Sequence, residues 1–133
     1  MQEAKTYIDS FEKGAIQAEA FNHRAHIKLA WSYIQVQPLH QAIGSVSGGL
    51  KTFAAKVGQP EKYHETITWA FMLLVHERHR QNPADDWAGF AAKNQDLFQS
   101  NALQQLYHQQ TLANPAAKQT FHLPDRLANE FRF

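Results

Sequence analysis

The most regular helical pattern in the chain occupies residues 61–81, EKYHETITWAFMLLVHERHRQ. Within it, the run from Ile67 to Val75 is apolar on nearly every side of a helix, which is typical of a central buried helix. Pro60 suits the first turn of such a helix, and the dipeptide Asn82-Pro83 is expected to end it. We therefore predict a long buried helix here, with the rest of the chain packed around it.

Apolar residues recur at helical spacing on both sides of this segment, and strict alternation is rare. Before it we expect a helix carrying Tyr7, Ile8 and Phe11 and ended by Gly14, a second capped by Asn22 and stopped by Pro38, and a third from Leu39 to Val57 with Gly58 as its C-cap. After it we expect a short helix capped by Asp85 or Asp86, another capped by Ser100 and bearing Leu103, Leu106 and Tyr107, one more turn after Asn114-Pro115, and an extended tail over 121–125.

The predicted third helix contains three glycines, Gly44, Gly48 and Gly49. Each helical glycine costs about 1 kcal/mol relative to alanine, so we expect a kink or break near Gly48-Gly49, or very close packing there. The same stretch lacks the spacing of a phosphate-binding loop and the setting of a nucleophile elbow, which excludes Ser47 as a nucleophile of that kind.

Composition limits the classes of protein that the chain can represent. Its 133 residues with 44% hydrophobic and 12% aromatic side chains predict one folded all-α domain over 1–133, a compact bundle of about five to six helices. Lys and Arg (13) nearly balance Asp and Glu (12) and are scattered, which argues against a nucleic-acid or membrane partner. The absence of cysteine excludes disulfides and thiol chemistry, and the N-terminal residues resemble no signal peptide, so we expect a soluble cytoplasmic protein.

Histidine is the over-represented residue type: the chain has eight, where ordinary composition gives roughly three. His23 and His26 are three residues apart and lie on one face of the predicted second helix. If Asn22 is its N-cap, both rings are in the first turn, where the helix dipole disfavours imidazolium and leaves neutral histidine available as ligand or base. The alternative is an ordinary pair of half-exposed surface histidines.

A second polar cluster, residues 62–68, leads directly into the apolar helix. His64 and Thr68 share a face, with Glu65 beside His64. Polar groups at such a place are costly unless they are paired or line a cavity. The alternative is helix capping, with Glu65 facing the dipole and the threonine hydroxyls bonding to carbonyls. A zincin protease is excluded, because the second histidine of its His-Glu-x-x-His motif is replaced by Thr68.

Taken together, these clusters resemble the motif set of a family of small, uncharacterised bacterial all-α proteins. The matching segments are Phe21-x-His23-x-x-His26, Ala30-Trp31, Phe53-Ala54-Ala55, residues 63–68, His76-Glu77-Arg78 and Phe121-x-x-Pro124-Asp125. The similarity covers the chain from about Phe21 onward, with the glycine-rich stretch at 44–49 as a departure. It implies that the two histidine-containing segments belong to one motif set, and it brings no activity with it.

The first functional hypothesis is a divalent metal site. His23, His26 and His64 would bind zinc, nickel or iron, since three neutral imidazoles suit these metals better than magnesium or calcium. Glu65 would be the fourth ligand or a catalytic base, although it lies about 100° around the helix from His64. An open coordination position would permit metal-assisted hydrolysis of a small substrate.

Two other hypotheses stay open. In one, the same residues form a metal-free binding module for a small organic or anionic ligand, held by imidazoles, by hydroxyls and by two helix N-termini. The ligand-contacting residues would be Tyr63, Thr66, Thr68 and Trp31. In the other, the histidines and Glu65 hydrogen-bond one another and only pin the helices together. The sequence specifies neither the reaction nor the substrate, and it leaves the oligomeric state open.

Overall fold

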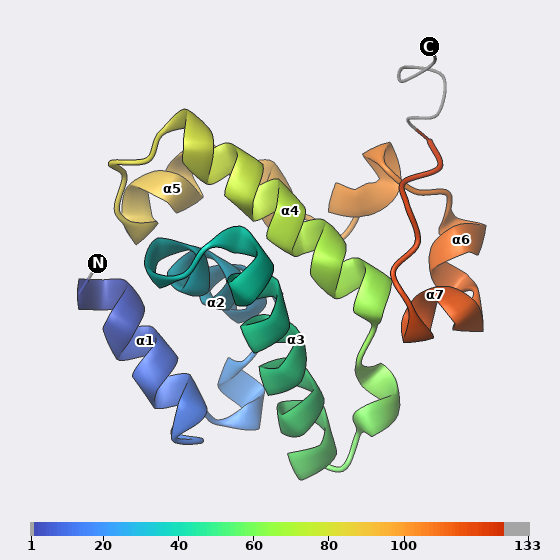
Figure 1. Cartoon of the computed structure of the whole chain (residues 1–133), viewed down its shortest axis with the longest axis horizontal. Coiled ribbons are helices and arrows are strands. Elements are labelled where there is room, and N and C mark those ends of the chain that lie inside the picture. Colours follow the sequence, from blue (N-terminus) through green and yellow to red (C-terminus); the bar gives the residue numbers. More distant parts are fainter. Residues whose placement is uncertain (1, 127–133) are drawn as a thin grey trace.

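The structure, a computed structural model, describes residues 2–126, and every regular element in that range is helical (Figure 1). The α-helices are α1 (Gln2–Glu12), α2 (His23–Val36), α3 (Leu39–Lys56), α4 (Glu65–Gln81), α5 (Trp87–Lys93), α6 (Gln109–Ala113) and α7 (Pro115–Gln119). Short 3₁₀ turns occupy Ala18–Ala20, Pro60–Lys62, Gln95–Phe98 and Ala102–Gln105. The prediction of an all-α bundle is confirmed, with seven α-helices in this range.

The four long helices form the main body (Figure 1), and α2 supplies more buried residues to its core than any other helix. Helix α2 contacts α1, α3 and α4 and buries Ile27, Leu29 and Trp31. Helix α4 contributes Met72 and Val75 to the same apolar cluster. A second, smaller cluster on α4 packs against residues 103–112, so α4 lies between the two parts of the molecule, as expected of a central helix.

Helix α4 begins four residues later than the sequence pattern predicted. The expected start was near Glu61, but residues Pro60–Lys62 form a separate 3₁₀ turn. His64 has an extended backbone and serves as the N-cap of α4, because its ring Nδ1 accepts a hydrogen bond of 3.1 Å from the backbone N–H of Ile67. A histidine cap of this kind is not among the common N-cap residues.

The glycines of α3 do not break it: the helix runs unbroken from Leu39 to Lys56. Close packing at Gly49 is the correct alternative, because a Cβ atom there would lie 2.7 Å from the ring of Phe11 on α1. A Cβ atom at Gly48 would have no neighbouring atom within 4 Å. Gly58 ends the helix with a positive φ of 76°, the left-handed conformation that glycine adopts without strain.

Residues 87–126 form short helices and turns: α5 and the turn Gln95–Phe98 pack into the main core, and α6 and α7 lie on the other side of α4 (Figure 1). The predicted cap Asn22 (α2) and Asp86, one of the two candidates for α5, accept hydrogen bonds from the first turns of their helices. Asn114, where one more turn was expected to begin, caps α7 in the same way. The prediction that Ser100 caps a helix is wrong, since a 3₁₀ turn starts after Asn101 without a side-chain cap. Helix α6 was not predicted.

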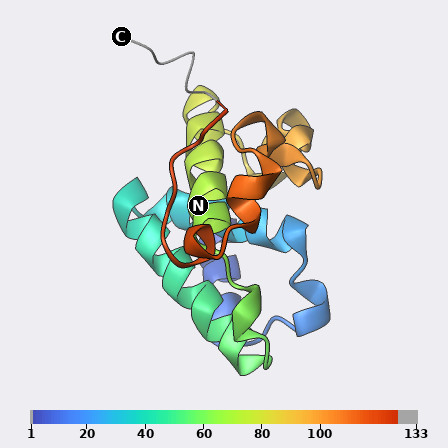
Figure 2. The same ribbon diagram turned by 90° about the vertical axis from the view of Figure 1, so that its right-hand side faces the viewer.

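The segment after α7 returns alongside α4 (Figure 2). The backbone N–H of His122 donates to Thr66 on α4, and the Tyr107 hydroxyl donates to the His122 carbonyl at 2.6 Å. None of the helices between residues 2 and 126 combines the length and apolar character needed to cross a bilayer.

Candidate functional site

His64 uses both of its ring nitrogens within the protein. Its Nε2 lies 2.8 Å from the carbonyl oxygen of Leu112 on α6, and its Nδ1 accepts from the N–H of Ile67. A carbonyl oxygen only accepts, so Nε2 carries the proton and the ring is the neutral Nε2–H tautomer. His64 therefore joins the start of α4 to α6.

Thr66 holds the C-terminal segment from a fully buried position, with 0% of its surface exposed. Its hydroxyl lies 2.7 Å from the carbonyl oxygen of Ala117 and 3.0 Å from that of Thr120, and it accepts from the N–H of His122 at 3.0 Å. Because a hydroxyl has one proton to donate, the two carbonyls share it. The side chain fixes α7 and the tail to α4.

Glu65 and Tyr63 are joined to Ser47 on α3. The Tyr63 and Ser47 hydroxyls both donate to Glu65 Oε1, the second at 3.1 Å, and the two hydroxyl oxygens are 2.8 Å apart. Burial, together with the hydrogen bond to Glu65, raises the pKa of Tyr63 to about 12, so the phenol keeps its proton at neutral pH. Glu65 is thus committed to two hydroxyl groups, and Ser47, excluded as an elbow-type nucleophile, has a structural partner instead.

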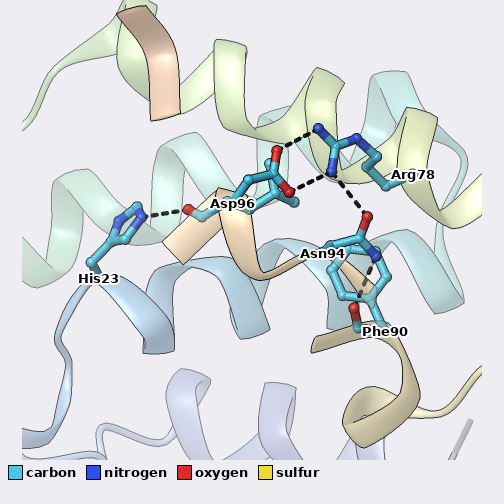
Figure 3. A network of polar contacts seen from close by, with 6 residues as sticks. His23, Arg78, Phe90, Asn94 and Asp96 are labelled. Atoms are coloured by element: carbon cyan, nitrogen blue, oxygen red, sulfur yellow. Dashed lines mark hydrogen bonds and ion pairs between the residues drawn. The ribbon is translucent and has the colours of Figure 1, made fainter. Parts of the chain in front are cut away.

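His23 belongs to a polar network that fixes the 3₁₀ turn Gln95–Phe98 between α2 and α4 (Figure 3). Its Nε2 donates to the carbonyl of Leu97 at 2.9 Å. Next to Leu97, the carboxylate of Asp96 receives two hydrogen bonds from Arg78, of 2.8 and 2.7 Å, and Arg78 also donates to Asn94 at 3.0 Å. The guanidinium holds the pKa of Asp96 below its usual range, as expected of a bidentate ion pair.

A pocket of about 500 Å³ opens between the start of α2, the C-terminal half of α3 and the start of α4. Its apolar lining consists of Ala18, Phe21, Leu50, Phe53, Ala54, Val57 and Ile67. Its polar lining consists of His26, Gln59, Lys62, Tyr63, His64 and Thr68. Such a volume, mostly apolar with a few polar groups, is typical of a small-molecule site.

His26 is the histidine whose ring faces this pocket without a partner in the protein. The ring packs on Phe21, with 4.4 Å between the ring centroids, and no hydrogen bond within residues 2–126 involves its nitrogens. The side chain is exposed to the pocket, yet the protein around it disfavours charge: this desolvation and, second, the nearby His23 lower the pKa of His26 to about 4. At neutral pH the ring is therefore uncharged, with one nitrogen as donor and the other as acceptor.

The structure brings together four of the residues that the sequence selected and places the other four elsewhere. His26, Tyr63, His64 and Thr68 line the pocket. His23, Glu65 and Thr66 hold other segments, as described above. Trp31 lies in the core, 1% exposed, with its ring centroid 5.7 Å from that of Trp87, and it does not line the pocket.

Sequence reasoning missed the aromatic wall and the cation of the pocket. Phe21 and Phe53 pack on each other with 4.8 Å between centroids, and Lys62 extends the polar side. Both phenylalanines belong to the segments that carry the family resemblance, which was the one signal that could have assigned them to the site.

The described residues, 2–126, contain no group of three or more His, Asp or Glu side chains arranged to hold a metal ion. His64 would have to give up the Ile67 N–H or the Leu112 carbonyl to bind one. The joint metal site of His23, His26 and His64 stays a prediction, as does catalysis by Glu65.

No family model, curated protein or solved structure shows a significant match to the chain. The resemblance to a family of small bacterial proteins stays a prediction.

Proposed function

We propose that the protein is a binding module that holds a small, largely apolar organic molecule in the pocket between α2, α3 and α4, without a metal ion. The observation that carries this proposal is the pocket itself, about 500 Å³ in volume, lined mainly by apolar side chains and containing an uncharged His26 whose ring nitrogens have no partner within residues 2–126. Pockets that bind small molecules have this size and this mixture of groups.

The apolar wall favours a ligand with an aromatic or branched aliphatic body. Phe21 and Phe53 form a continuous ring surface, and Leu50 and Val57 extend it along α3. Ring faces and edges pack well on other rings, which adds to the gain from removing apolar area from water. His26 beside Phe21 then supplies a directional hydrogen bond at the end of this wall.

Two polar residues of the lining, Tyr63 and His64, are held in place by hydrogen bonds within the protein. His64 is fixed by Leu112 and Ile67, and the Tyr63 hydroxyl by Glu65 and Ser47. A site whose groups are already ordered loses less conformational entropy on binding, which supports affinity. Tyr63 and His64, held by these hydrogen bonds, thus contribute to binding by keeping the pocket in shape.

The proposal is tested by titration with the neutral fluorescent dye N-phenyl-1-naphthylamine. The Ala54→Phe variant places a ring in the pocket wall, whereas Ala55→Phe places the same ring at the next, exposed position of α3, outside the lining. We expect dye binding at least about tenfold weaker in Ala54→Phe, about 1.4 kcal/mol, and unchanged in Ala55→Phe. Equal affinity in the two variants, both folded by circular dichroism, would overturn the proposal.

Metal-assisted hydrolysis is the competing proposal for the same histidines, and metal analysis separates the two. Protein purified without added metal is analysed for zinc, nickel and iron, alongside His23→Ala and His64→Ala. Near-stoichiometric metal in the wild type, lost in both variants, would replace the metal-free proposal.

A further inference from the structure

We propose that the ligand of this pocket is an organic anion: an apolar body that carries a single negative charge, which is met by Lys62. This inference rests on the proposed function and names its ligand class. Three observations carry it, namely the charges of the lining residues, the pairing of Lys62 and the inventory of free hydrogen-bond donors.

The charged groups that line the pocket are positive, and none is negative. Lys62 is its cation, and no Asp or Glu is among the lining residues. His26 adds no charge at neutral pH, because the surrounding protein lowers its pKa to about 4. Both ring nitrogens of His64 are engaged within the protein, with Nδ1 as an acceptor. A cationic ligand would meet repulsion here, and an anionic one attraction.

Lys62 has no acidic partner in the described part of the chain. None of the ion pairs formed within residues 2–126 includes it. Its neighbour Glu61 lines a different hollow, which shares only Tyr63 with the pocket. An unpaired ammonium group beside an apolar wall is suited to the charged end of a ligand whose body lies on that wall.

The hydroxyl and imidazole protons of the lining are already partly used. Tyr63 donates to Glu65, His64 to the Leu112 carbonyl and Thr68 to the His64 carbonyl, the last at 2.8 Å. The groups that still have protons to donate to a ligand are Lys62, His26 and Gln59. Lys62 offers donors alone, so the strongest unmet hydrogen-bonding capacity in the pocket is for an acceptor with negative charge.

Because Lys62 is exposed, the charged end of the ligand sits at the solvent edge of the pocket and its body inside. Exposed ion pairs are weak, so the expected effect of Lys62 on affinity is about two- to fivefold. It is also expected to decrease as salt is added, since exposed charges are screened over about 10 Å at 0.1 M ionic strength.

The test compares two displacers of N-phenyl-1-naphthylamine that have nearly the same shape: naphthalene-1-carboxylate, which is charged, and naphthalene-1-carboxamide, which is not. We expect the carboxylate to bind more tightly than the amide. The affinity ratio of carboxylate to amide should fall by about two- to fivefold in Lys62→Gln and stay at the wild-type value in Lys118→Gln. Lys118 is the matched control, because it lines the neighbouring hollow and its removal changes the net charge equally.

The outcomes separate this inference from the proposal beneath it. If the ratio is the same in Lys62→Gln and in the wild type, or falls equally in Lys118→Gln, the anion inference is overturned, while dye binding sensitive to Ala54→Phe still supports the pocket. If the affinities of the carboxylate and the amide fall by the same factor in Lys62→Gln, the lysine contributes packing and not charge, and the inference also fails. If Ala54→Phe leaves dye binding unchanged, the pocket proposal fails and the anion inference with it.

Discussion

The two ends of the molecule are held together in different ways. Residues 2–81 contain four helices of 11 to 18 residues, whose apolar faces share one large core. Residues 87–126 contain helices of only five to seven residues. Helix α5 and the turn Gln95–Phe98 join the large core, whereas α4 holds the later part of this segment with polar side chains as well as apolar ones. His64, Thr66 and Arg78 on or beside α4 each bind a different part of this segment.

The short helices of residues 109–119 explain why the polar residues 63–66 stand at the start of the apolar helix α4. Helices of five residues have little stability of their own, because the nucleation cost is spread over few hydrogen bonds. The Tyr63-His64-Glu65-Thr66 segment supplies donors and acceptors that fix α6, α7 and the tail, and Tyr63 and His64 also face the pocket. One short segment therefore serves both the assembly of the C-terminal third and the shape of the candidate site.

Removal of the Thr66 hydroxyl is expected to cause the largest loss of stability, because Thr66 attaches α7 and residues 120–122 to α4. Thr66→Val leaves two carbonyls and the N–H of His122 without their partner in a buried place. We expect a loss of about 2–3 kcal/mol in the free energy of unfolding, measured with urea. Thr52→Val, at an exposed position of α3, should change it by less than about 0.5 kcal/mol.

Hydrogen exchange locates the effect of Thr66→Val. Amides of α6 and α7 should exchange faster in the variant, while those of α2 change only with global stability. Uniform loss of protection across all helices would show that the C-terminal third is not a separate unit and would contradict the comparison.

Substitution of His64 divides its two roles. His64→Asn keeps a side chain that caps α4 but cannot reach Leu112, whereas His64→Ala loses both contacts. We expect destabilisation of about 1 kcal/mol for Asn and about 2 kcal/mol for Ala by chemical denaturation. Equal costs for the two variants would mean that the cap contributes nothing, and no cost for His64→Asn would mean that the bond to α6 contributes nothing.

The close packing of α1 on α3, within residues 2–81, is tested by substitution of two neighbouring glycines of α3. Gly48→Ala should stabilise the protein by about 0.5–1 kcal/mol, because its Cβ meets no atom and alanine is the better helix former. Gly49→Ala should destabilise it by about 1 kcal/mol, because the new methyl group collides with Phe11. Thermal denaturation measures both, and stabilisation by both substitutions would contradict the close contact of α1 with α3.

The stability of the protein is also expected to depend on pH through His26. Its pKa is lowered from 6.5 to about 4 in the folded protein, so the unfolded chain binds the proton at higher pH. Stability is therefore expected to fall as the pH decreases from about 6.5 to 4. In His26→Gln this part of the decrease should disappear, as measured by urea unfolding at pH 7 and pH 4.5; an identical decrease in variant and wild type would contradict the lowered pKa.

The sequence predicted the parts of the fold that local signals control. The helical class and the caps Asn22 and Asp86 follow from periodicity and from the residue before each helix. Helix α6 was missed because Asp125, seventeen residues downstream, accepts from its N-cap N–H at His108. The late start of α4 was missed because a histidine performs the capping.

For the candidate site, the sequence selected two of the segments that line the pocket but not the direction of each side chain. His26 and His64 line one pocket, whereas Trp31 lies in the core and Glu65 turns to Ser47. Those partners lie on other helices or at distant backbone carbonyls, and carbonyls have no sequence signature. The part of the pocket wall that α3 supplies also depends on how α3 packs on α4, and the spacing of apolar residues in the sequence does not specify that packing.

The central claim is that His64 and His23 are structural and that His26 faces a metal-free ligand pocket. Long-range ¹H–¹⁵N spectra of the histidine rings test it most directly, recorded with naphthalene-1-carboxylate and, separately, with one equivalent of zinc. The account predicts the Nε2–H tautomer for His64, a ligand-dependent shift of the His26 ring, and no stoichiometric response to zinc. A joint shift of the His23, His26 and His64 ring nitrogens on addition of one equivalent of zinc would contradict it.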